Sequence, residues 1–220
     1  MYIQDSSGYI LDLIAKGEHQ EQDFKFEITD ARKIAKTLSA FANTAGGRLL
    51  VGVKDNGKIA GVRSAEEEGH QIVSAAQLYC KPEPNFGIKM HKAEGKTVLE
   101  VVVNEVVQKP CYAMDADNAP KAYLRIHDEN VLASPVHLRV WKMKRVQRGA
   151  LIKYSAQEQV LLSHLSKNKT ISISRYCEIA SIPRQRAINT LAKFVHFDIA
   201  VPIYSEKGFV YQLIEEQSLA

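Results

Sequence analysis

Several polar side chains near the carboxyl end of the chain have the types and the spacing to hydrogen-bond nucleic acid. Apolar residues at Ile188, Leu191 and Val195 predict a helix over residues 184–195 with one buried face. The outward face of this helix carries Arg184, Gln185, Arg186, Asn189, Thr190 and Lys193. Arg, Asn and Gln make paired hydrogen bonds to base edges, while Lys and Thr usually hold phosphates. The alternative is a helix that contacts protein or mediates dimerisation, and both interpretations stay open.

The segments around this helix fit a winged helix-turn-helix. Ser155 and Glu158 form a capping-box pattern that predicts the start of a first helix. The elements predicted after it are a short helix at 174–180, a turn at 181–183 whose proline suits the first helical position, and strands at 201–204 and 209–213. Lys207 would lie at the tip of the wing between these strands, in reach of the DNA backbone or the minor groove.

Charge is unevenly distributed along the 220 residues, whose net charge is +4. Residues 1–138 hold 16 Lys or Arg against 19 Asp or Glu, whereas residues 139–220 hold 13 against 6. Six of the basic residues lie between Arg139 and Lys153, a stretch without acids. This asymmetry favours a polyanion as partner, with DNA expected first and RNA as the other possibility. The alternative is that these side chains only keep the surface solvated.

Composition predicts a globular cytoplasmic protein. Hydrophobic residues make up 45% and charged residues 25% of the chain, which are ordinary values. No apolar run reaches the length of about 18 residues needed to span a membrane, and the first residues carry acids without the basic region of a secretory signal. Cys80, Cys111 and Cys177 are far apart and have no CxxC spacing, so neither a disulfide framework nor a zinc site is expected.

In the amino-terminal half, a helix and a strand are predicted in direct succession. Apolar residues recur with helical spacing from Ala31 to Ala42, after Thr29 or Asp30 as the cap and before Gly46 or Gly47 as the stop. Residues 49–53 are apolar on both faces, as in a strand that is covered on both sides. Asn56-Gly57 then predicts a two-residue turn in which both residues have φ > 0.

This half of the chain resembles the Schlafen-type AlbA domain, a family also described as DNA-binding or divergent AAA. The resemblance covers residues 10–135 and is carried by Gly17-Glu18, Asp23-Phe24-Lys25, Ala40–Gly47, Gly52-Val53-Lys54-Asp55, Lys109-Pro110 with Tyr112, and Tyr123–Ile126. It implies an α+β domain that acts on nucleic acid.

The resemblance also marks three acids, Glu18, Asp23 and Asp55, at positions that form a metal-dependent endonuclease site in the ribonuclease members of the family. Clustered carboxylates bind Mg²⁺ or Mn²⁺ and so suit such a site. Two departures weaken the match: position 23 is Asp rather than Glu, and Lys54 replaces an acid of the family pattern. The alternatives are an Asx-turn role for Asp55 and a solvated acid at position 18.

The fold class predicted is therefore α+β, with a mixed sheet and packed helices in residues 1–148 and a winged helix-turn-helix in residues 154–220. The boundary is expected near 148–154. Further elements expected in the first domain are helices at 65–79 and 135–144, the latter leading out of the domain, strands at 85–90, 97–103 and 122–126, and a loop at 113–120.

The function predicted is a nucleic-acid-binding protein, a DNA-binding transcriptional regulator that works as a homodimer, because helix-turn-helix proteins usually read paired half-sites. One alternative is a metal-dependent endoribonuclease that uses Glu18, Asp23 and Asp55. Another is a non-catalytic adaptor that binds protein. No cofactor is expected apart from Mg or Mn in the nuclease case, and an ATPase is disfavoured because the GxxxxGK[ST] motif is absent.

Overall fold

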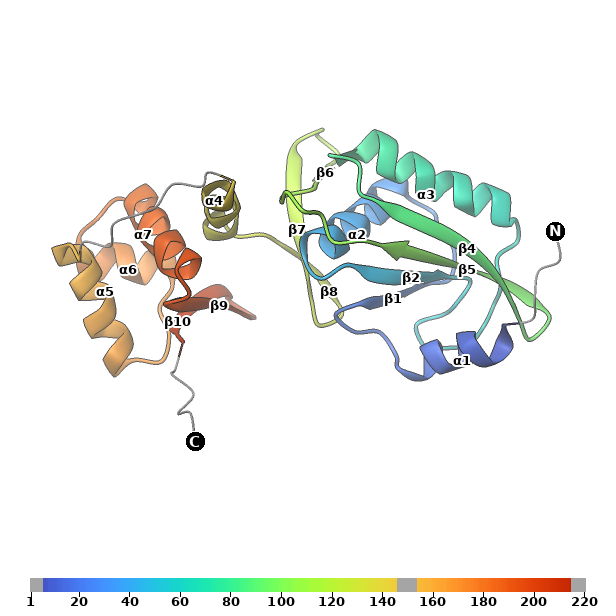
Figure 1. The fold of residues 1–220 in the computed structure, drawn as a ribbon, viewed down its shortest axis with the longest axis horizontal. Helices are drawn as coiled ribbons and strands as arrows, with labels where there is room; N and C mark the ends of the chain where they lie inside the picture. The colour runs from blue at the N-terminus through green and yellow to red at the C-terminus, as the bar shows by residue number, and fades with distance from the viewer. Residues whose placement is uncertain (1–5, 146–153, 215–220) are drawn as a thin grey trace. The chain divides into compact units, whose positions relative to one another are not determined.

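The computed structural model describes residues 6–145 and 154–214, and the chain divides into two compact units, Met1–Ala133 and Ser134–Ala220 (Figure 1). The domain boundary was predicted near 148–154, and residues 148–153 of that range lie outside the described residues. The first unit contains α1 (Ser7–Ala15), β1 (Gln22–Lys25), α2 (Ala31–Asn43), β2 (Gly47–Val51), α3 (Ala65–Tyr79), β3 (Cys80–Lys81), β4 (Phe86–Ala93), β5 (Lys96–Val103), β6 (Tyr112–Met114), β7 (Pro120–Ile126) and β8 (Glu129–Leu132). None of the helices described is long and apolar enough to cross a membrane.

A four-stranded mixed sheet with the order β1-β2-β5-β4 forms the centre of the first unit. β1 pairs with β2 in parallel, while the other two pairings are antiparallel, so the predicted mixed sheet is confirmed. Leu49 and Val51 of β2 pack with α2 and α3, whereas Leu50 packs with α1 on the opposite face (Figure 1). This two-sided cover is the physical reason for the continuous apolar run in β2.

A second sheet, with the order β3-β6-β7-β8, corrects the prediction of a loop at 113–120. Tyr112–Met114 pairs with β7 as the strand β6, and only the residues between β6 and β7 form the loop. β8, at Glu129–Leu132, was not predicted either. Both strands are short, and β6 pairs with β3, which lies about thirty positions earlier in the chain. The local sequence pattern therefore does not predict β6 or β8.

Helix α2 lies between the two sheets and is fixed at both ends by groups that the sequence pointed to. The Asp30 side chain accepts hydrogen bonds from the backbone N–H groups of Arg32 and Lys33 and so caps the helix. Gly46 ends it with φ +78°, and a Cβ at this position would lie 2.8 Å from the Val103 carbonyl oxygen. Any other residue would therefore be strained there and would also clash with β5.

A buried asparagine joins α2 to the second sheet. The Asn43 amide group donates to the carbonyl oxygens of Cys111 (2.8 Å) and Tyr123 (3.0 Å), and its oxygen accepts from the Cys111 N–H (2.7 Å). Because Asn43 is only 1% exposed, these bonds take the place of the hydrogen bonds that its side chain would make to water. They hold the start of β6 and the middle of β7 against the carboxyl end of α2.

The turn after β2 differs in type from the prediction. The Gly57 N–H donates to the Lys54 carbonyl oxygen (2.7 Å), which makes Asp55 and Asn56 the central residues of a β-turn. Gly57 has φ +78°, whereas Asn56 does not have a positive φ. The expected turn with two positive φ values is therefore wrong, and a turn followed by a left-handed glycine replaces it. Such a turn with two positive φ values does occur at Glu94-Gly95 between β4 and β5.

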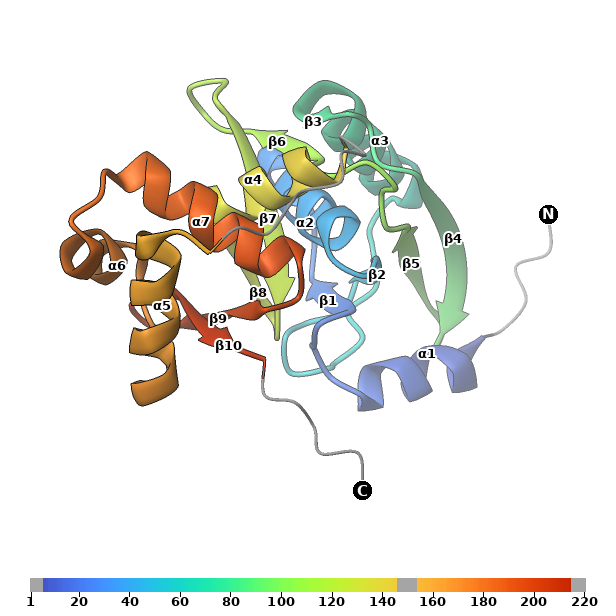
Figure 2. The same cartoon turned by 60° about the vertical axis from the view of Figure 1, so that its left-hand side comes forward.

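The second unit contains α4 (Pro135–Lys144), α5 (Ala156–Lys167), α6 (Ile173–Ala180), α7 (Arg184–His196), β9 (Ala200–Ser205) and β10 (Gly208–Leu213). α4, expected in the first domain, belongs to this unit because Val136 and Val140 pack into the same core as Leu161 and Leu191 (Figure 2). The helix pattern of residues 135–144 was predicted correctly, but its core partners lie twenty or more positions further along the chain.

The three helices after α4 and the antiparallel hairpin β9–β10 follow the order that the sequence predicted. The capping box at Ser155 and Glu158 is present at the start of α5. A three-residue turn joins α6 to α7, with Ser181 in the left-handed region (φ +50°) and Pro183 as the residue before the first helical position. Pro183 was expected one position further into the helix.

Candidate functional site

Two of the three acids marked by the sequence come together beside β1. Asp23 lies on β1 and is 3% exposed, and Glu18 precedes the strand and accepts a hydrogen bond from the Phe24 N–H (2.9 Å). The two carboxyl groups lie within hydrogen-bonding reach of each other. Burial, together with the neighbouring Asp23 carboxylate, raises the pKa of Glu18 to about 7, so this group takes up a proton near neutral pH.

Asp23 is also the counter-ion of a buried arginine. Arg125 of β7 is 2% exposed, and its Nη2 lies 3.2 Å from Asp23 Oδ1. The same guanidinium donates to the Gln22 carbonyl oxygen and to Asn130 Oδ1, both at 3.1 Å. Lys25 Nζ approaches the other Asp23 oxygen at 3.1 Å. The Asp23 carboxylate therefore neutralises two cations and ties the first sheet to the second.

Arg125 is a residue whose role the sequence reasoning missed. It occurs between the apolar residues Leu124 and Ile126 in a predicted strand. A charged residue in such a run requires a buried partner of opposite charge, and this was the available signal. The identity of the partner depends on a contact across about one hundred positions, which the local pattern does not contain.

Asp55 does not join Glu18 and Asp23 in a metal-binding group. It is an exposed central residue of the turn after β2. Within residues 6–145 and 154–214, no three or more His, Cys, Asp or Glu side chains are placed to hold a metal ion. Arg125 and Lys25 already contact the Asp23 carboxylate and would compete with a metal ion for it. In the described residues the three acids therefore do not form a ready-made metal-binding group, and their metal-dependent role stays a prediction.

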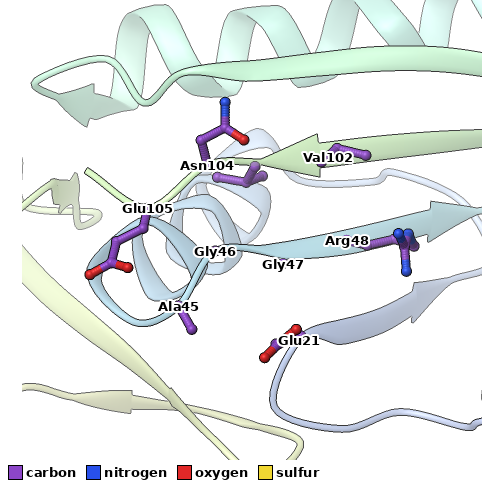
Figure 3. Close-up of a pocket in the computed structure, with 9 residues that line it drawn as sticks. Glu21, Ala45, Gly46, Gly47, Arg48, Val102, Asn104 and Glu105 are labelled. Carbon is purple, nitrogen blue, oxygen red and sulfur yellow. The ribbon is translucent and has the colours of Figure 1, made fainter. Parts of the chain in front are cut away.

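A cavity of about 250 Å³ opens where α2 ends and β2 begins (Figure 3). Its lining includes the backbone of Gly46 and Gly47 and the side chains of Glu21, Arg48 and Asn104. Arg48 Nε is bound to the buried Glu100 at 2.7 Å, so its guanidinium is held in place. None of the three acids marked by the sequence lines this cavity.

In the second unit, α7 presents part of the polar face that the sequence predicted. Arg184, Gln185 and Arg186 are exposed in its first turn, and Lys207 is exposed in the turn between β9 and β10. Asn189 is half-buried, and its Oδ1 lies 3.4 Å from Gln185 Nε2. These side chains place donors and acceptors of the kinds that recognise base edges and phosphates near the start of the helix.

Two members of the predicted face, Lys193 and Thr190, are less accessible than the residues of the first turn. Lys193 Nζ lies 2.8 Å from Oε1 of Glu158, a residue of α5 that is only 6% exposed. Thr190 is half-buried, and the nearby Tyr176 hydroxyl of α6 donates to the Gln157 carbonyl oxygen (3.0 Å). Lys193 therefore joins α7 to α5, and Thr190 is less accessible than the first-turn residues, while a phosphate contact of either residue stays a prediction.

Comparison with known families identifies the first unit. Residues 18–134, more than half of the chain, match the family described as Schlafen, AlbA_2. The chain belongs to the Schlafen, AlbA_2 family. The matched range ends at the junction between the two units. It therefore contains both four-stranded sheets of the first unit, α2, α3 and the Glu18–Asp23 pair. Membership of the Schlafen, AlbA_2 family indicates a nucleic-acid-associated function.

Solved structures add two similar chains. The DIP2311 protein of Corynebacterium diphtheriae is 19% identical, with a TM-score of 0.46, over 93% of this chain and 37% of the other. The N-terminal domain of a RecG-related protein from Nitrosomonas europaea is 20% identical, with a TM-score of 0.42, over 70% of this chain and 98% of the other. The Schlafen, AlbA_2 protein thus spans little more than a third of the C. diphtheriae chain. No curated protein matches it.

Proposed function

We propose that this Schlafen, AlbA_2 protein binds duplex DNA through its second unit and acts as a transcriptional regulator. In this proposal residues 154–214 form a winged helix-turn-helix in which α7 is the recognition helix and β9–β10 is the wing. One observation carries the proposal: a three-residue turn sets α7 against α6, and Arg184, Gln185 and Arg186 are exposed in the first turn of α7. Residues at the amino end of a recognition helix are those that contact base edges.

The remaining contacts of α7 support this role. Its apolar side chains Ala187, Leu191 and Phe194 are buried in the core of the second unit, so the helix is held rigidly. The Lys193–Glu158 ion pair adds a connection to α5. A helix that is fixed in this way can present its exposed side chains in one orientation, which sequence-specific recognition requires.

We further propose that the protein binds as a homodimer. A helix-turn-helix dimer reads two half-sites about 34–36 Å apart, and this spacing mirrors its own two-fold symmetry. Analytical ultracentrifugation with and without a palindromic duplex tests this part. A strict 1:1 complex of one chain per duplex contradicts it.

Direct binding measurements test the main proposal. Fluorescence anisotropy of a labelled random-sequence duplex, at several NaCl concentrations, should show binding by the full chain that weakens steeply with salt, because bound counterions are released. Arg184→Ala and Arg186→Ala should each weaken binding and lower the salt slope by about 0.9, since each removes one cation from the surface that meets the duplex. Asp55→Ala is the matched control at an exposed turn and should bind as the wild type does. Equal affinity of all four proteins refutes the assignment of α7.

The alternative function is endoribonuclease activity, and the observation that favours it is the contact between Glu18 and Asp23 with the raised pKa of Glu18. The exposed position of Asp55 and the ion pairs of Asp23 disfavour it. A gel assay on labelled tRNA, with Mn²⁺ or with EDTA, separates the two functions. Cleavage that needs metal, is lost in Asp55→Ala and persists in Arg184→Ala establishes the nuclease. A protein that neither binds nor cleaves leaves the non-catalytic adaptor.

A further inference from the structure

Helix α4 lies directly against the proposed recognition helix. Val136 and Val140, one helical turn apart, point into the core that α7 fills with Ile188 and Leu191. Figures 1 and 2 show α4 beside α7, and the two helices are in contact along their packed faces. The position of α4 in the second unit is therefore fixed by apolar packing and does not depend on its charged residues.

Outside its packed face α4 carries several basic residues. The segment 134–145 contains Arg139, Lys142, Lys144 and Arg145 and no acid. Lys142, Lys144 and Arg145 are exposed, and they form no ion pair with any side chain in the described parts of the chain. Other cations of the same unit do have partners: Lys193 pairs with Glu158, and Arg175 pairs with Glu178.

Helix stability does not account for this arrangement. Cations near a helix carboxyl end interact favourably with the helix dipole, but each gains only about 0.3–1 kcal/mol at an exposed site. Lys142 and Arg145, however, are three positions apart on the same face, where like charges repel each other. Uncompensated cations that share a face are instead suited to a ligand that carries closely spaced negative charges, and a nucleic-acid backbone provides them.

We propose that α4 is a phosphate-binding element that flanks α7. In this arrangement Lys142 and Arg145 bind backbone phosphates of the duplex that α7 contacts, and α4 adds affinity without reading sequence. Arg145 can bind a phosphate through two parallel hydrogen bonds, while Lys142 acts as a point charge. This inference rests on the proposed DNA binding by the second unit, which it extends to a helix outside the helix-turn-helix.

The test compares two double variants with equal loss of charge. Lys142→Gln/Arg145→Gln removes the two positive charges that share a face of α4. Lys81→Gln/Lys89→Gln removes two exposed lysines of the first unit and serves as the matched control. Binding of the full chain to a labelled 30-base-pair random-sequence duplex is measured by anisotropy from low to moderate NaCl. Circular dichroism of each variant establishes that it is folded.

Each phosphate contact contributes about 0.9 to the slope of log affinity against log salt, so the α4 variant should lose about 1.8 from this slope. A fourfold rise in NaCl should then weaken wild-type binding about 12-fold more than it weakens binding by the variant. The control should keep the wild-type slope. A wild-type slope in a folded α4 variant, or an equal loss in the control, overturns the proposal. No duplex binding by the wild type refutes the proposed function itself and is seen before any variant is compared.

Discussion

Replacement of Asp23 by Asn tests whether this acid is structural. The substitution keeps the shape of the side chain but removes the negative charge that faces Arg125, which is 2% exposed. Loss of one partner of a buried ion pair costs about 3–5 kcal/mol, because the other charge stays buried without compensation. The Lys25 contact adds little, since the Lys25 side chain is 37% exposed and its charge is screened by solvent.

A second effect of Asp23→Asn partly offsets this loss of stability. The Asp23 charge is one of the causes that raise the pKa of Glu18, so its removal relieves a repulsion between the two carboxyl groups. We therefore expect Asp23→Asn to lower the free energy of unfolding of the first unit by about 3 kcal/mol. For a unit of this size that corresponds to a drop of roughly 10 °C in the midpoint of thermal unfolding.

The assay uses the position of the single tryptophan. Trp141 lies in α4, so its fluorescence reports the second unit, whereas far-ultraviolet circular dichroism reports both units. In urea at pH 7, Asp23→Asn should move the dichroism transition to lower urea and leave the Trp141 transition in place. The control Asp55→Asn, in an exposed turn, should stay within about 0.5 kcal/mol of the wild type. Equal stability of Asp23→Asn and wild type refutes the structural assignment.

Two further predictions concern the second unit. Burial lowers the pKa of His137 to about 4 from its ordinary value of 6.5, so the unfolded chain binds the proton first and the unit loses stability as the pH falls from 6.5 toward 4. Urea unfolding followed by Trp141 fluorescence should show this loss in the wild type and much less of it in His137→Asn. Lys193→Met leaves the buried Glu158 without its cation and should cost about 1–3 kcal/mol, while the salt slope of DNA binding stays unchanged. A lower slope in that variant would show that Lys193 does contact phosphate.

The parts of the fold that were predicted correctly depend on local signals. α2 needed only the helical period, the cap at Asp30 and the glycine after it, and the capping box at Ser155 placed α5 in the same way. The parts that were wrong or missing depend on distant partners. β6 and β8 exist because β7 pairs with them, and α4 belongs to the second unit because its apolar face matches the core around α7.

For the candidate sites, too, the sequence predicted the local features, whereas contacts between distant residues had to come from the structure. Sequence alone determined which residues carry charge and donors, which helix face they share, and that a family of nucleic-acid-associated proteins is matched. Only the tertiary structure decided which charges are already neutralised. Arg125 forms an ion pair with Asp23, and Lys193 forms one with Glu158. Asp55, Arg184 and Arg186 are exposed. The physical reason is that two charges form an ion pair only when they lie close together in space. Lys193 and Glu158 are 35 positions apart in the chain, and Arg125 and Asp23 are 102 positions apart, so local sequence does not show that they meet.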